Sequence, residues 1–138
     1  MTAQSHYNSL AKRQGVLFDL HCSLPGECAV ADADFSALLC NLIENALEAC
    51  GRMTSGERFI RVGIALMGSA LNIRVSNSAA AGATALGGNR FASSKAEGRI
   101  GYGLYSVRMI ARKYGGQSET AWDEAHGVFT HSVTLFLQ

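Results

Sequence analysis

The stretch DFSALLCNLIENALEAC, residues 34–50, decides the fold. Its apolar residues recur every three to four positions, which predicts an amphipathic helix with an apolar side covering about half of the circumference. Asp32 or Asp34 is a suitable N-cap, and Gly51 follows the last apolar residue. On the other side, an arc of about 100° carries only polar residues. These are Asn41, Glu44, Asn45 and Glu48.

This polar stripe permits two interpretations. A solvated face is the common explanation for such a stripe on an amphipathic helix. However, asparagine is unfavourable in a helix interior, and amide and carboxylate oxygens suit Mg²⁺, which completes its shell with water and phosphate oxygens. The second interpretation makes Asn45 a direct Mg²⁺ ligand and gives Glu44 or Glu48 a role through water.

The segments around this helix predict a two-layer α/β sandwich. Alternating apolar and polar residues predict five strands, the last four in two hairpins: Val16–Ser23, Arg58–Leu66, Leu71–Ser76, Gln117–Trp122 and Gly127–Leu137. A second helix is predicted at Gly103–Tyr114, and the aperiodic stretch Asn77–Tyr102 predicts a long loop of the kind that often forms a lid. This order of elements favours a mixed, mostly antiparallel sheet with the helices on one face.

Length and composition limit the classes of protein. The chain has 138 residues, enough for one domain, which we assign to residues 15–138, with 1–14 as a leader or the end of a preceding helix. A hydrophobic content of 48% excludes a disordered chain, and no apolar run reaches the length of a membrane helix. A net charge of +1 argues against nucleic-acid binding. Cys40 and Cys50 fit the helix core, and no C-x-x-C pair occurs, so we expect a reducing compartment.

Glycines precede the second helix in the segment Gly101-Tyr102-Gly103-Leu104. Glycine lets the backbone approach an anion closely, and the free N–H groups of a helix N-terminus favour phosphate. A flexible loop end is the alternative explanation. Ser94, Lys95 and Arg99 in the preceding loop would add hydroxyl and cationic contacts. The segment is neither a P-loop nor a dinucleotide-binding fingerprint, because the residues those motifs require are absent.

Together these motifs resemble one superfamily. NLIENALEA (residues 41–49) resembles the N-box of the ATP-binding fold shared by gyrase, heat-shock chaperone, histidine kinase and mismatch-repair ATPases. GYGLYSV (residues 101–107) resembles its second glycine box. Over residues 15–137 the likeness is strongest to the catalytic domain of sensor histidine kinases of the peptide quorum-sensing receptor type (AgrC-like). In that type the first glycine box is reduced to a strand ending in asparagine, as in RVSNS (residues 74–78).

The resemblance implies roles for individual residues. Asn45 would be the Mg²⁺ ligand, and Asn77 would replace the aspartate that reads adenine. Lys95 would reach the terminal phosphates, and Gly101 and Gly103 would shape the lid hinge and the start of the helix. The full ATP-binding set is Asn41, Asn45, Asn77, Ser94, Lys95, Arg99, Gly101, Tyr102, Gly103 and Leu104. The residues implied to act in catalysis are Asn41, Glu44 and Lys95.

Two departures from the superfamily pattern bear on activity. The usual D-x-G-x-G is absent, because Ser78–Ala81 contains no glycine. Asn41 stands where the hydrolysing members carry a glutamate general base, one turn before the metal ligand. An amide cannot take a proton from water, so we predict little ATP hydrolysis and favour phosphoryl transfer to another group.

The resemblance therefore implies transfer of the γ-phosphoryl group of Mg·ATP to a histidine. His21 and His131 fall in predicted strands and are expected to be structural, so the acceptor belongs on a dimerisation helix elsewhere in a longer receptor. A response regulator would be the downstream partner, and the domain itself would lie in the cytoplasm without contacting membrane or nucleic acid. Two alternatives stay open: a degenerate, non-catalytic nucleotide-binding or interaction module, and a serine kinase of the anti-sigma-factor type on the same fold.

Overall fold

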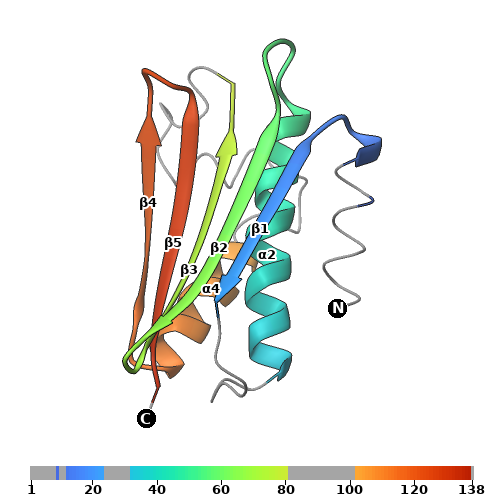
Figure 1. Cartoon of the computed structure of the whole chain (residues 1–138). Coiled ribbons are helices and arrows are strands. Elements are labelled where there is room, and N and C mark those ends of the chain that lie inside the picture. The colour runs from blue at the N-terminus through green and yellow to red at the C-terminus, as the bar shows by residue number, and fades with distance from the viewer. Residues whose placement is uncertain (1–8, 10–11, 24–31, 81–101, 138) are drawn as a thin grey trace.

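The computed structural model describes residues 9, 12–23, 32–80 and 102–137. Each predicted strand and helix is present, with ends that differ from the prediction by at most two residues. Figure 1 shows their arrangement. The elements are β1 (Leu17–Ser23), α2 (Asp32–Gly51), β2 (Phe59–Met67), β3 (Ala70–Ser78), α4 (Tyr102–Lys113), β4 (Gln117–Asp123) and β5 (Val128–Phe136).

The strands form one mixed sheet in the order β1-β2-β3-β5-β4. β1 and β2 are parallel, because α2 lies between them in the chain and provides the long crossover that a parallel pair requires. The other neighbouring pairs are antiparallel. The prediction of a mixed, mostly antiparallel sheet is confirmed.

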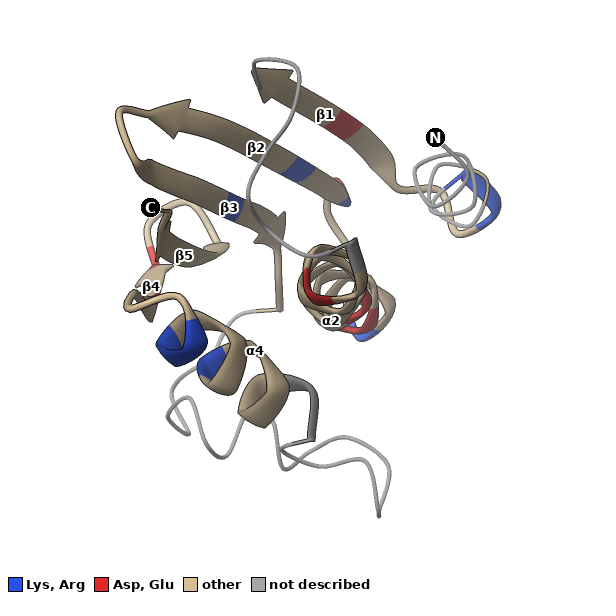
Figure 2. Ribbon diagram, turned by 90° about the horizontal axis from the view of Figure 1, so that it is seen from below, with Lys and Arg blue, Asp and Glu red and all other residues tan. Residues whose placement is uncertain are grey.

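Both described helices pack against one face of this sheet. Figure 2 shows α2 and α4 side by side below the strands, and no described helix or strand covers the opposite face. This is the predicted two-layer α/β sandwich. Within the part of the chain that the structure describes, no helix is both long and apolar enough to cross a membrane.

The core lies between the helices and the inner face of the sheet. Residues of β2 and β3 alternate between buried and more exposed positions, as expected for strands covered on one face. Their buried side chains meet the apolar side of α2, where Cys50 is fully buried and Cys40 packs against the core, as predicted for both cysteines. The fully buried residues of largest volume include Leu38, Leu42, Ile60, Leu71, Ile73 and Leu135.

Two glycines end α4 and join it to β4. The N–H of Gly115 donates to the carbonyl of Arg112 at 2.9 Å, and the N–H of Gly116 donates to the carbonyl of Ala111 at 2.8 Å. With a φ of 71° at Gly115, this is a Schellman ending, which glycine favours. At Gly116 a β-carbon would lie 1.7 Å from the carbonyl oxygen of Thr134, so the backbone of β5 leaves no room for a side chain.

One local prediction was wrong. Asn77 and Ser78 belong to β3 and not to the following loop, because β5 is long enough to pair with them through Phe129 and Val128. Of the two aspartates predicted as N-cap of α2, Asp34 lies inside the helix, which begins at Asp32. The rest of the predicted loop, residues 81–101, is outside the described residues, and the domain boundary at residue 15 stays a prediction.

Candidate functional site

The amide-bearing side of α2 faces α4. At about 100° per residue, Asn41 and Asn45 each lie within about 20° of the direction of Asp34 around the helix. The carboxylate of Asp34 accepts a hydrogen bond from Tyr114 Oη at 2.6 Å and lies 2.9 Å from Lys113 Nζ. These contacts join the first turns of α2 to the C-terminal end of α4, and they lower the pKa of Asp34, the Tyr114 hydrogen bond contributing most.

The two helices run in opposite directions along each other (Figure 1). Because the end of α4 is held at the beginning of α2, the first residues of α4 lie toward the half of α2 that carries Asn45. Tyr102 and Gly103 open α4, as the second glycine box predicts, and Leu104 follows as a partly buried residue. The N-terminus of α4 and the amides of α2 are thus on the same side of the molecule.

Asn45 carries a buried side-chain oxygen. Its Oδ1 is inaccessible to solvent, and no donor among the described residues reaches it. Leaving a buried acceptor unsatisfied costs about 1–3 kcal/mol, so each such atom in a folded protein needs an explanation. An amide oxygen is a ligand that Mg²⁺ accepts. Asn45 therefore fits the predicted role of metal ligand.

The other residues of the polar stripe, Asn41, Glu44 and Glu48, are also partly buried. Glu48 Oε1 is inaccessible to solvent, as Asn45 Oδ1 is, and it lies 4.0 Å from Nη2 of Arg52 on the next turn. Glu44 lies about 100° around the helix from Asn45, so the structure does not bring these two side chains together. A role of Glu44 through water stays a prediction.

Asn77 lies at the end of β3, on the face of the sheet that α2 covers. Strand alternation puts it on the same side as the buried residues Leu71, Ile73 and Val75. It is 3% exposed, and its Nδ2 donates to the carbonyl of Ser78 at 2.9 Å. The Sγ of Cys50, near the end of α2, lies 3.6 Å from that same carbonyl. Asn45 precedes Cys50 by five residues, about 7.5 Å of helix axis, so both candidate amides lie at the same end of the α2–β3 contact.

His131 lies on the same inner face of the sheet, two residues along β5 from the partner of Asn77. It is 7% exposed. Burial, with a smaller contribution from the positive charge of Arg108 on α4, lowers the pKa of His131 to about 4. The side chain is therefore neutral at ordinary pH, which agrees with the structural role predicted for it. Alternation along β5 could have shown that this histidine faces inward, but not that a cation lies near it.

Four of the predicted nucleotide contacts lie outside the described residues: Ser94, Lys95, Arg99 and Gly101. The side chain of Tyr102 is not described either. The described part of the site therefore consists of the α2 amides, the end of β3 and the start of α4.

Comparisons with solved structures agree with this fold. The catalytic domain of histidine kinase ThkA superposes with a TM-score of 0.69 at 21% identity, covering 95% of this chain and 88% of that one. A histidine kinase from Burkholderia phymatum STM815 gives 0.69 at 22% identity, covering 99% and 65%. The cytoplasmic segment of histidine kinase QseC gives 0.62 at 16% identity, covering 99% and 71%. At these identities the likeness concerns the fold, and no curated protein matches the sequence.

A family assignment comes from the sequence itself. Residues 31–135 match the GHKL domain family. The match begins just before α2 and ends in β5, so it includes the amide stripe, Asn77 and the start of α4. The chain belongs to the GHKL domain family.

Proposed function

We propose that this chain is the ATP-binding catalytic domain of a sensor histidine kinase. It would bind Mg·ATP and transfer the γ-phosphoryl group to a histidine on a separate dimerisation helix. The family assignment and the fold shared with histidine kinase catalytic domains support the general class. The observation that carries the site is the buried Oδ1 of Asn45, on the side of α2 that faces α4, for which the described residues supply no hydrogen-bond donor.

Each part of the site has a task in this proposal. Asn45 would hold Mg²⁺, which when bound neutralises charge on the phosphates. The first N–H groups of α4 would donate to phosphate oxygens, with Lys95, Ser94 and Arg99 adding contacts from the loop. Asn77 would read the base, because an amide oxygen can accept a hydrogen bond from the exocyclic amine of adenine.

The residues favour transfer over hydrolysis. Hydrolysis needs a base to take a proton from water, and Asn41 stands where such a base would be. His131 is a poor substitute, since burial lowers its pKa to about 4. Phosphoryl transfer to an imidazole mainly requires positioning and charge neutralisation. Glu44, which precedes Asn45, would act through water.

The acceptor and the partners lie outside the described site. His21 is in an exposed pair with Asp19 at 3.0 Å, and His126 in an exposed pair with Asp123 at 2.8 Å. We therefore propose a histidine-bearing dimerisation helix of the full-length receptor as acceptor and a response regulator as the next partner. Cytoplasmic placement and the quorum-sensing receptor type are part of the same proposal. The reduced first glycine box around Asn77 supports the receptor type.

One departure from the superfamily supports a second candidate. No glycine follows Asn77 where the superfamily has D-x-G-x-G, which would suit a degenerate, non-catalytic module. Incubating the chain with labelled ATP, Mg²⁺ and a supplied histidine-bearing helix distinguishes the two. We expect an acid-labile phosphohistidine on the helix. Nucleotide binding without any transfer would indicate the degenerate module. A second incubation with a serine-bearing protein in place of the helix tests the anti-sigma-factor type of kinase, which would label that serine.

A further inference from the structure

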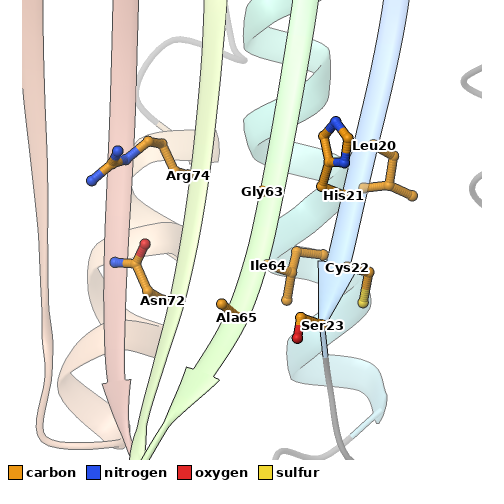
Figure 3. A pocket seen from close by; sticks show the side chains of 9 residues that line it. All are labelled: Leu20, His21, Cys22, Ser23, Gly63, Ile64, Ala65, Asn72 and Arg74. Atoms are coloured by element: carbon orange, nitrogen blue, oxygen red, sulfur yellow. The ribbon is translucent and has the colours of Figure 1, made fainter.

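The face of the sheet that no described helix or strand covers carries a polar trough, away from the proposed nucleotide site. Its volume is about 670 Å³. It runs along β2 between β1 and β3, on the face of the sheet opposite to α2 and α4 (Figure 3). We call it the β2 trough; its lining residues are Leu20, His21, Cys22, Ser23, Gly63, Ile64, Ala65, Asn72 and Arg74.

Strand register gives the trough a floor of small residues and polar walls. Gly63 pairs with His21 of β1 on one side and with Arg74 of β3 on the other. Figure 3 shows the imidazole and the guanidinium on opposite sides of the Gly63 backbone. The next row repeats the pattern with Ser23, Ala65 and Asn72.

The backbone does not require glycine at position 63. Gly63 is not among the positive-φ glycines, and no heavy atom would lie within 4 Å of a β-carbon placed there. Glycine inside a strand weakens the strand, and it often marks a place where a ligand approaches the backbone closely. The missing side chain therefore opens space between the two walls.

The charges at the trough favour an anion. Among the residues that the structure describes, Arg74 forms no ion pair, although it is exposed and carries five N–H donors. Asp19, the acidic residue beside the β1 wall, is paired with His21 at 3.0 Å. Ser23 adds a hydroxyl, and the Asn72 amide is held by Nδ2 contacts at 3.4 Å to Thr134 Oγ1 and the Val133 carbonyl. A carboxylate entering the trough would meet the Ser23 hydroxyl on the β1 side and the Arg74 guanidinium on the β3 side.

We propose that the β2 trough docks an acidic segment of a protein partner, with an aspartate or glutamate side chain inserted above Gly63 between His21 and Arg74. A small molecule would stay largely in water here, because the trough is open, whereas ligand sites bury most of a small ligand. A segment of a protein partner would be shielded from water by the rest of that partner. Nucleic acid fits poorly, because the chain has a net charge of only +1.

An NMR titration of the full ¹⁵N-labelled chain tests this docking site. The probe is an eight-residue peptide of alternating glutamate and alanine, with an equal peptide of lysine and alanine and sodium phosphate as the other arms. We expect the glutamate peptide to shift the backbone amides of Gly63, Ala65 and Arg74. Gly63→Val should weaken its binding about tenfold by filling the floor, and Arg74→Glu should weaken it at least as much.

The variants separate loss of the site from loss of the fold. Valine suits a strand interior and has room at position 63, so Gly63→Val should keep its stability and its ATP affinity. Arg112→Glu, which changes an exposed charge on α4, is the matched control and should leave peptide binding unchanged. Peptide shifts that are scattered over the surface, equal binding of the lysine peptide, or full binding by Gly63→Val would overturn the proposal. Phosphate that reproduces the shifts at equal concentration would overturn the choice of a protein segment.

Discussion

Two residues on the helix side of the sheet place polar atoms out of contact with solvent: Asn45 on α2 and His131 on β5. Asn45 has a buried oxygen with no partner among the described residues, and His131 keeps a neutral imidazole under α4. Polar groups at such positions lower stability unless a ligand or another residue satisfies them. Both can therefore be tested one residue at a time.

His131 predicts that the protein loses stability in mild acid. Its pKa is about 4 in the folded chain and near 6.5 in the unfolded chain, so below pH 6.5 the unfolded state binds more protons. The stabilisation is complete above pH 6.5 and is lost as the pH falls toward 4, about 3 kcal/mol in all. Denaturant unfolding of the wild type and of His131→Gln at several pH values measures it.

The difference between the wild type and His131→Gln isolates the contribution of this histidine to the pH dependence of stability. Other groups also lose stabilisation at low pH, including Asp34 and Asp123, whose pKa values hydrogen bonds lower. Those losses are common to both proteins and cancel in the difference. If the wild type and His131→Gln lose the same free energy between pH 7 and 4.5, the burial of a neutral His131 is not the cause.

At the scale of elements, the junction between α4 and β4 depends on one glycine. Gly116→Ala would place a β-carbon 1.7 Å from the carbonyl oxygen of Thr134, which forces the backbone of β5 or of the junction to move. We expect a loss of about 3 kcal/mol, in the range of severe overpacking. Urea unfolding measures it, with Gly63→Ala as the control, since that site is open. Equal stability of the two variants would contradict this packing.

The contact between α2 and α4 makes a second prediction at this scale. Asp34→Ala removes the acceptor of the Tyr114 hydroxyl and the partner of Lys113. We expect a lower unfolding midpoint and weaker ATP binding, because α4 presents its N-terminus to the phosphates only while its other end is held. Asp19→Ala, in an exposed pair on the open face, is the control and should change neither quantity. A variant of Asp34 with unchanged ATP affinity would show that this contact does not position α4.

Periodicity predicted the elements but not the contacts between distant ones. The alternation in β2 and β3 and the 3.6-residue pattern of α2 follow from burial on one face, so sequence alone located them. The link from Asp34 to Tyr114 joins residues 80 positions apart, and no local pattern reveals it. The amides of α2 were predictable because their types are unusual in a helix. The β2 trough was not, because it depends on the register of three strands.

At the scale of the whole molecule, the account predicts a kinase with little ATPase activity. With Asn41 in place of a carboxylate base, phosphate release from Mg·ATP should be far slower than transfer to a supplied histidine helix. Asn41→Glu restores a carboxylate one turn before Asn45 and should raise hydrolysis, whereas Asn41→Gln should not. A phosphate-release assay measures both variants, and rapid hydrolysis by the wild type would contradict the assignment of Asn41.

The central claim is that the amide side of α2 binds magnesium-bound ATP, and calorimetry tests it most directly. Titrations with ATP, with and without Mg²⁺, compare the wild type with Asn45→Ala and with Asn45→Asp, which keeps an oxygen ligand. We predict that Asn45→Ala weakens Mg·ATP binding at least about tenfold and changes metal-free ATP binding little. Asn45→Asp should keep the gain in ATP affinity that Mg²⁺ provides. Equal affinity of wild type and Asn45→Ala for Mg·ATP would contradict the claim.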